Sequence, residues 1–238
     1  MKSTPYAAIP PIILAVDTPD ITMALNWVKT TDGLISVVKL GLEFFISCGV
    51  EGVKRIQGES GVDIFMDLKL HDIPNTVGQA AAVVSSFHPR FLTVHASGGS
   101  KMISAAVSNA PSVDITAVTV LTSLGKFDLS EIGFSRPPME SAVQLAALAK
   151  AAGARAIVCS PQETSAIRSV VGSEITIITP GVRPQNFGSD DQERVMTPRD
   201  AIMAGANYLV VGRPITSYWK DGKTAMREAA IKFAAELG

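Results

Sequence analysis

The sequence predicts an α/β fold, a (β/α)8 TIM barrel that forms one domain over residues 1–238. Eight short apolar runs alternate with helical segments, the length suits one barrel, and polar residues follow the ends of the apolar runs. An open, doubly wound sheet is the alternative. No Gly-x-Gly-x-x-Gly motif follows the first run, which continues as AVDTPD, so the dinucleotide-binding sheet loses its main support. We therefore expect the closed barrel.

The expected strands are short and almost continuously apolar, as is typical of parallel strands that are covered on both faces. In chain order they occupy residues 12–16, 34–40, 62–70, 90–96, 113–121, 155–160, 174–179 and 207–212. Helical segments lie between them, and the clearest two, residues 141–154 and 224–237, carry Ala, Leu, Lys and Glu at helical spacing. Residues 182–195 are long, polar and interrupted by Gly and Pro, which indicates a functional loop.

Composition excludes several classes of protein. The chain is 47% hydrophobic, which excludes disorder, and its 21 basic against 22 acidic residues provide no basic surface for nucleic acid. Cys48 and Cys159 stand in apolar contexts outside any metal-ligand motif, so we expect two reduced, buried thiols. No run reaches the roughly 18 apolar residues that a membrane span needs. We expect a cytoplasmic protein that uses no metal and binds neither nucleic acid nor membrane.

Two charged residues interrupt the third expected strand, which otherwise resembles core. Side chains alternate across a strand, so Asp67 and Lys69 point to the same face, and in a barrel that face is the mouth. Lys39 ends the second strand and is placed to join them, and Asp72 follows the third strand. Each charge would be costly to bury alone, so we expect a paired network. Its role is either catalytic or that of a structural ion-pair cluster.

A second group of residues resembles a phosphate site. The seventh strand ends in TPGVRP and the eighth in VVGRPIT, and a short helix is expected after Pro214. Many barrels bind phosphate with the loops that follow these two strands. Gly181 and Gly212 would let backbone N–H groups approach the anion, and Arg183 and Arg213 would bind its oxygens. The alternative is two ordinary turns with solvated arginines.

Three further residues at strand ends are weaker candidates. His95 ends the fourth strand and is either a base or a hydrogen-bonded structural histidine. Thr122 and Ser123 follow the fifth strand and could donate to a heterocycle or a carbonyl, or could simply belong to a turn. We assign no role to His71 or His88.

The run MDLKLHDIPNT, residues 66–76, closely resembles the D-x-K-x-x-D-I-P-x-T signature of the orotidine 5′-phosphate decarboxylase family, in its bacterial type. The resemblance extends along nearly the whole chain. AVD, VKLG, VHASGG, VTVLTS, CSPQE, TPGVRP, DQERV and NYLVVGRPIT all resemble family segments, in the same order. This ordered series is far more specific than a short D-x-K match, which related sugar-phosphate decarboxylases share.

The resemblance implies decarboxylation of orotidine 5′-phosphate to uridine 5′-phosphate, without a cofactor. Lys69 would protonate C6 after carbon dioxide leaves, and Asp67 would place its negative charge against the substrate carboxylate. Lys39 and Asp72 would complete the charge network. The resemblance further implies that Asp17 and Lys39 hold the ribose hydroxyls and that Thr122 and Ser123 contact the pyrimidine. The phosphate would be held by Arg183, Gln192, Gly212 and Arg213. The resemblance also implies a homodimer in which Asp72, Ile73 and Thr76 reach into the partner's site.

Two other functions remain open at this stage. One is a 3-keto-L-gulonate 6-phosphate decarboxylase or hexulose-phosphate synthase, which shares the D-x-K-x-x-D frame but uses a divalent metal and lacks the HDIPNT continuation. The other is a nucleotide-phosphate-binding protein without catalysis. A mere binder has no use for an aspartate that faces a carboxylate, and this disfavours the second alternative.

Overall fold

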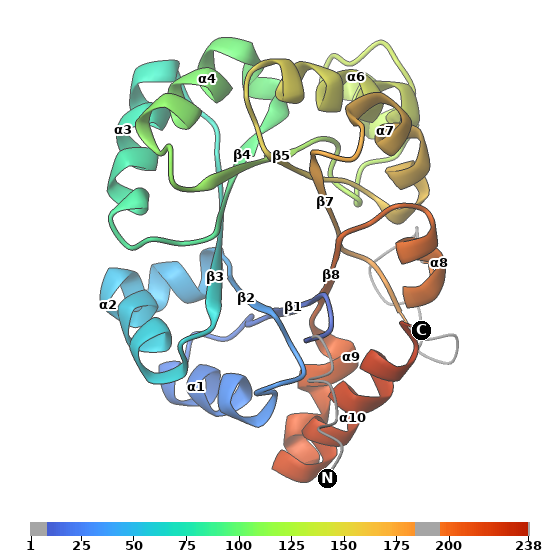
Figure 1. Cartoon of the computed structure of the whole chain (residues 1–238). Coiled ribbons are helices and arrows are strands. Elements are labelled where there is room, and N and C mark those ends of the chain that lie inside the picture. The colour runs from blue at the N-terminus through green and yellow to red at the C-terminus, as the bar shows by residue number, and fades with distance from the viewer. Residues whose placement is uncertain (1–8, 184–195, 238) are drawn as a thin grey trace, which may run out of the picture.

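The predicted closed barrel is confirmed. The computed structural model describes residues 9–183 and 196–237, in which the strands β1 to β8 follow one another in sequence order and β8 pairs with β1. Every neighbouring pair is parallel, and Figure 1 shows the helices arranged outside the ring of strands. The open, doubly wound sheet is therefore excluded, because its edge strands would not pair.

Each strand lies inside its predicted range. The strands are β1 Ile12–Ala15, β2 Val37–Leu40, β3 Asp63–Leu70, β4 Phe91–His95, β5 Asp114–Val118, β6 Ala156–Val158, β7 Thr176–Thr179 and β8 Tyr208–Val211. The largest difference is at β5, which begins one residue after the apolar run 113–121 and ends three residues before it does. Val120 is buried although it lies outside the strand, so this part of the run reflects burial rather than sheet pairing.

Each of the seven connections from one strand to the next contains a helix of at least six residues. The helices are α1 Ile21–Thr30, α2 Leu42–Ser60, α3 Pro74–Ser85, α4 Gly99–Asn109, α5 Lys126–Glu131, α6 Pro138–Ala151, α7 Thr164–Val171, α8 Pro198–Met203, α9 Arg213–Thr216 and α10 Lys223–Ala235. The two predicted helices correspond to α6 and α10. Helix α6 begins earlier than predicted because Pro138 occupies its first turn, where proline is favoured. The short helix expected after Pro214 is α9, and it already begins at Arg213.

The strands separate two hydrophobic cores. The outer core lies between strands and helices, and Leu68 and Leu70 pack against it, as the alternation in β3 predicts. The inner core fills the barrel and consists of Ile13, Val37, Phe65, Phe91, Ala156 and Ile178. The ring of Phe91 makes edge contacts with two others, at centroid distances of 5.6 Å to Phe65 and 5.9 Å to Tyr208. Apolar side chains thus fill the interior of the barrel below its mouth.

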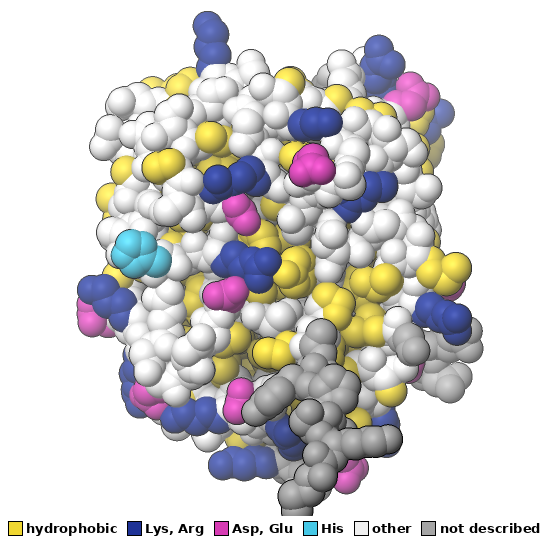
Figure 2. Space-filling view, viewed as in Figure 1, with side chains coloured by type: hydrophobic (Ala, Val, Ile, Leu, Met, Phe, Trp, Pro, Cys, Tyr) yellow, Lys and Arg dark blue, Asp and Glu magenta, His cyan; other side chains and the backbone are white. Residues whose placement is uncertain are grey.

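Ion pairs lie at the amino-terminal ends of the strands. Arg90 bonds Asp63 at 3.2 Å, and Arg155 bonds Asp114 at 2.7 Å. In Figure 1 the strands follow one another clockwise, which for right-handed β-α-β connections means a view from these ends. The same view in space-filling form shows basic and acidic side chains side by side near the middle of this face (Figure 2). The carboxyl ends of the strands lie on the opposite face.

Both cysteines are free thiols, but only one is fully buried. Cys159 is 1% exposed, as expected, whereas Cys48 on α2 is only partly covered. The prediction of burial is wrong for Cys48, whose Sγ lies at the surface, 3.4 Å from the carbonyl oxygen of Pro19. No helix within residues 9–183 and 196–237 is long and apolar enough to cross a membrane.

The inner core yields a stability prediction. Phe91→Ala removes a fully buried ring and both of its aromatic contacts, so we expect a loss of about 3–5 kcal/mol in the free energy of unfolding. Urea unfolding at one fixed protein concentration measures it. The matched control is Phe127→Ala, since Phe127 is 89% exposed and its replacement should change little. Equal effects of the two changes would contradict the assignment of Phe91 to the core.

Candidate active site

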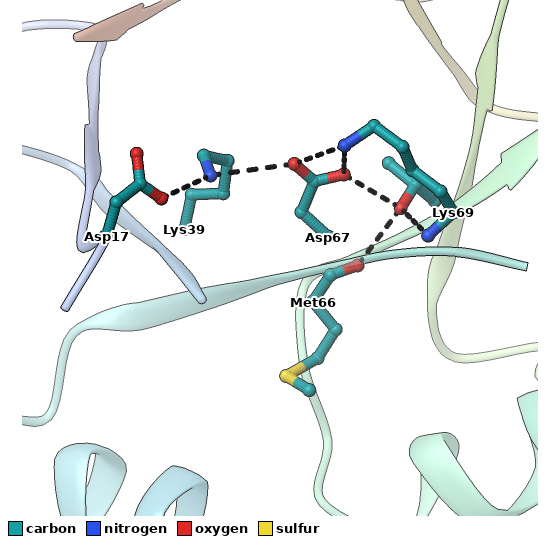
Figure 3. Close-up of polar contacts among 6 residues, drawn as sticks. Asp17, Lys39, Met66, Asp67 and Lys69 are labelled. Carbon is teal, nitrogen blue, oxygen red and sulfur yellow. Dashed lines mark hydrogen bonds and ion pairs between the residues drawn. The ribbon is translucent and has the colours of Figure 1, made fainter. Parts of the chain in front are cut away.

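A chain of four charges lies at the carboxyl ends of β1, β2 and β3. Lys69 Nζ lies 2.9 Å from both carboxylate oxygens of Asp67. Lys39 Nζ lies 3.6 Å from Asp67 Oδ2 on the other side and donates to Asp17 Oδ1 at 3.1 Å. Figure 3 shows the resulting order Asp17, Lys39, Asp67, Lys69. Two lysines and two aspartates form a neutral set, and the prediction that Asp67 and Lys69 share a face is confirmed.

Asp67 is the most confined carboxylate of the set, with its residue 8% exposed. Burial raises the pKa of its carboxyl, but the charges of Lys39 and Lys69 outweigh this and hold the pKa below its ordinary value. Hydrogen bonds from Lys69 and from Thr93, at 3.0 Å, act in the same direction. Asp67 is therefore ionised at neutral pH, in a place from which most water is excluded.

These charges form part of a pocket of about 310 Å³ at the carboxyl ends of the strands. The pocket is lined by Ala15, Asp17, Lys39, Phe65, Asp67, Lys69, Val118, Val120, Leu121, Thr122, Val158, Cys159, Pro180, Gly181, Val182, Arg183, Val210, Gly212, Arg213 and Pro214. The charges of β1–β3 and the apolar residues that end β5 and β6 are contributed by opposite sides of the barrel. Such a pocket suits a ligand with one charged and one apolar side.

Two arginines enter the pocket after β7 and β8. Arg183 is 4% exposed, whereas Arg213 begins α9 and is exposed. Gly181 adopts φ +77°, a left-handed conformation that favours glycine and turns the chain two residues before Arg183. A Cβ on Gly212 would make an ordinary contact with the Cβ of Ala15, at 3.4 Å, so the loop after β8 lies directly beside the end of β1. The arginine-containing loops can therefore hold an anion beside the acidic and basic groups of β1–β3.

The structure places most of the predicted residues in this pocket. Those that line it are Asp17, Lys39, Asp67, Lys69, Thr122, Arg183, Gly212 and Arg213. Ser123 is exposed and outside the lining, and Gln192 lies outside the described residues. The predicted loop 182–195 also falls mostly outside them, since only its first two residues are described.

Asp72, Ile73 and Thr76 are exposed and lie outside the pocket of their own chain. The carboxylate of Asp72 accepts from the backbone N–H of Ile73 at 2.6 Å instead of approaching a lysine. The expectation that Asp72 completes the network is thus not met within one chain. The second carboxylate of the neutral set is Asp17, because β1 and β2 are neighbours and Ala15 pairs with Lys39.

Sequence reasoning missed the apolar side of the pocket, which comprises Val118, Val120, Leu121, Val158 and Cys159. An apolar residue that ends a strand cannot be told from core by its type alone. One signal was present, because the apolar run 113–121 continues past the end of β5, and its last two residues, Val120 and Leu121, line the pocket.

His95 ends β4 but does not line the pocket, so the structure favours the structural role over that of a base. Its ring lies 5.3 Å from the ring of His71. Burial lowers the pKa of His95, the charges of His71 and Lys69 lower it further, and Asp67 opposes them. His95 is therefore a neutral imidazole at neutral pH. No group of three or more His, Cys, Asp or Glu suited to a metal ion occurs within the described part of the chain.

The fold and the site together define a (β/α)8-barrel protein with a small-molecule pocket of the kind barrel enzymes use. Comparison with known proteins is more specific. The model of the orotidine 5′-phosphate decarboxylase / HUMPS family matches residues 10–229. This chain belongs to that family.

Several relatives are similar over almost their whole length. The orotidine 5′-phosphate decarboxylase of Thermobifida fusca is 47% identical over 227 residues, with 95% of both chains covered. That of Frankia casuarinae is 42% identical over 251 residues, covering 98% of this chain and 92% of the relative. The crystal structure of the Lactobacillus acidophilus orotidine 5′-phosphate decarboxylase gives a TM-score of 0.79 at 32% identity, covering 96% of this chain and 99% of that one. The similarity thus includes both sequence and fold.

The environment of His95 predicts a pH effect on stability. The folded chain lowers the pKa of His95, so as the pH falls the unfolded chain binds a proton before the folded chain does. The free energy of unfolding therefore decreases. This loss begins below pH 6.5, the ordinary value. We expect His95→Gln to lose less unfolding free energy than the unchanged protein between pH 7.5 and 5.5, measured by urea unfolding. The control is His88→Asn, at an exposed position outside the pocket that already has φ +53°. Equal pH dependence of His95→Gln and the unchanged protein would contradict the assignment.

Proposed function

We propose that this protein decarboxylates orotidine 5′-phosphate to uridine 5′-phosphate. The observation that carries the proposal is the contact of Lys69 Nζ with both oxygens of a buried, ionised Asp67 at the mouth of the barrel. A cation and an anion held side by side can act on one reacting carbon. The relatives that bear the name of this enzyme support the same substrate.

Lys69 is proposed as the proton donor. When the bond between C6 of the pyrimidine and the carboxylate breaks, carbon dioxide leaves and the electron pair stays on C6. The ammonium group of Lys69 stabilises this developing negative charge and then transfers a proton to C6, after which the neutral amine regains a proton from water. The side chains of Asp67 and Lys39 are largely buried, so charges at this end of the pocket are less screened than in water, which strengthens the stabilisation. No cofactor takes part in this proposal.

Asp67 is proposed to face the substrate carboxylate. Its negative charge is held in place by lysines on both sides, at 2.9 Å and 3.6 Å, so it cannot easily turn away from a second anion. Repulsion between the two carboxylates raises the energy of the bound substrate and disappears when neutral carbon dioxide forms. Before the substrate binds, the positive charge of Lys39 offsets part of the cost of burying the Asp67 carboxylate.

The remaining residues are proposed to orient the substrate. The phosphate would contact Arg183, Gly212 and Arg213, which line the pocket after β7 and β8, and also Gln192, which lies outside the described residues. Asp17 and Lys39 would hold the ribose hydroxyls, and Thr122 with Ser123 would contact the pyrimidine. Binding energy from the phosphate, far from C6, would then help to hold the substrate against Asp67.

We further propose that the protein is a homodimer in which Asp72, Ile73 and Thr76 complete the partner's site. All three are exposed in the single chain, and Ile73 is 65% exposed despite being a large apolar residue. An isologous dimer would cover this surface and place Asp72 near the partner's lysines. A cytoplasmic location, expected from the sequence, stays a prediction.

The proposed reaction is tested by the ultraviolet absorbance of orotidine 5′-phosphate mixed with the purified protein in EDTA. We expect spectral conversion to uridine 5′-phosphate, because the proposed mechanism needs no metal. Lys69→Ala removes the proton donor and should abolish conversion, while uridine 5′-phosphate binding stays measurable by calorimetry.

The outcomes of this experiment separate the alternatives. A protein that is inactive in EDTA but acts on sugar phosphates with Mg²⁺ would be one of the metal-dependent relatives. Nucleotide binding without turnover in the unchanged protein would indicate a binding protein instead. An active Lys69→Ala variant would overturn the proposed mechanism but not the substrate.

The shared site predicts complementation between inactive variants. A hybrid of a Lys69→Ala chain and an Asp72→Ala chain contains one site in which both residues are intact. Mixing equal amounts under conditions of subunit exchange should therefore restore roughly a quarter of the full activity, since half of the dimers are hybrids with one working site.

The matched control mixes Lys69→Ala with Asp67→Ala. Both residues belong to the same barrel, so no hybrid of these two chains contains an intact site, and activity should stay absent. If Lys69→Ala and Asp72→Ala regain nothing while mass spectrometry demonstrates exchange, Asp72 does not serve the partner's site.

A further inference from the structure

The pairing of β3 with β4 is irregular where the site begins. Met66 pairs with Leu92, and the next pair is Leu70 with Val94. Three residues of β3, Asp67 to Lys69, therefore face a single residue of β4, Thr93. A bulge of this kind redirects side chains and leaves backbone groups of the bulged strand without their regular partners. Asp67 and Lys69, the two charged residues of β3 that line the pocket, both lie inside it.

Lys69 has an unusual backbone conformation within the bulge. Its φ is +50°, one of only two positive values at non-glycine residues in the described part of the chain. An unbranched L-residue in this region carries a conformational cost that its surroundings must offset. The conformation matters because it fixes where the lysine side chain leaves the backbone, next to Asp67.

Thr93 joins the two charged residues through one hydroxyl. Its Oγ1 accepts a hydrogen bond from the backbone N–H of Lys69 at 2.8 Å and donates one to Asp67 Oδ1 at 3.0 Å. Thr93 is fully buried and does not line the pocket. It therefore does not meet a ligand there, but it bonds the backbone of Lys69 and the carboxylate of Asp67, the two residues proposed to act on the substrate.

We propose that Thr93 is a positioning residue that holds Lys69 and Asp67 in their working geometry. Its hydroxyl replaces the ladder bond that the bulge removes from Lys69, and so stabilises the left-handed conformation there. The same hydroxyl orients the Asp67 carboxylate by occupying one lone pair of Oδ1. A hydroxyl can accept and donate at once, so serine can fill this role, whereas valine, which has the same shape as threonine, cannot.

This inference rests on the proposed decarboxylation, and its test compares Thr93→Val with Thr93→Ser. If the hydroxyl positions the pair, Thr93→Val should lower kcat on orotidine 5′-phosphate at least tenfold, while uridine 5′-phosphate affinity stays within threefold. Thr93→Ser should stay within about threefold of the unchanged protein in both measurements. If only packing mattered, the order would reverse, since valine fills the space and serine leaves out a methyl group.

Thr116→Val is the matched control. Thr116 is fully buried on β5, pairs directly with Thr93 in the sheet, and donates only to the carbonyl oxygen of Asp114 in its own strand. Its loss should leave kcat within about threefold. If Thr93→Val does not fold, Thr93→Ser and Thr93→Ala decide the matter, because both lack the methyl group and only serine keeps the hydroxyl.

The outcomes separate this inference from the proposed function. An unchanged protein that does not convert orotidine 5′-phosphate overturns the proposed function itself, and the role of Thr93 with it. An active unchanged protein with a normal kcat in Thr93→Val, or with Thr93→Ser as impaired as Thr93→Val or Thr93→Ala, overturns the positioning role alone. A lower kcat in Thr93→Val with recovery in Thr93→Ser supports it.

Discussion

The carboxylate of Asp67, held ionised in a confined place between two lysines, is the interaction on which the rest of the site depends. Removing such a charge from water is costly, and here Lys69 at 2.9 Å and Lys39 at 3.6 Å offset the cost. Each lysine in turn needs the carboxylate, because without it two like charges would lie close together on one side of the pocket. Asp17, bonded to Lys39 at 3.1 Å, makes the set neutral. The site is thus assembled before any substrate arrives.

The barrel makes this arrangement possible because the residues that stabilise the fold and the charged residues of the site lie in different parts of it. The inner core around Phe65 and Phe91 and the outer core beneath the helices fill the space below the mouth with close-packed apolar side chains. Charges from β1, β2 and β3 then meet at the mouth, because parallel strands end on the same side. A rigid base lets charges be placed in positions that would be unfavourable on a flexible loop.

Much of this was predictable from the sequence, for identifiable physical reasons. Parallel strands covered on both faces leave a pattern of apolar runs, and a charge inside such a run, as at Asp67, is expensive enough to indicate a site. The partner of Lys39 was not predictable in the same way. Asp17 was expected to hold the ribose, yet register between β1 and β2 makes it the second carboxylate of the network in place of Asp72. The apolar side of the pocket was not predicted, because Val118 and Val158 cannot be distinguished from core residues in the sequence.

The bulge in β3 was beyond the reach of sequence patterns, and it explains most about the site. Simple alternation places Asp67 and Lys69 on one face, roughly 6.5–7 Å apart along a regular strand. The contact of 2.9 Å between their side chains is accompanied by an irregular backbone with φ +50° at Lys69 and a hydroxyl from the neighbouring strand. The strand thus gives up two regular pairings in the sheet to bring a cation and an anion together. A fold that tolerates this local cost at its mouth, above a fully packed interior, can keep a strained and charged site without losing its overall stability.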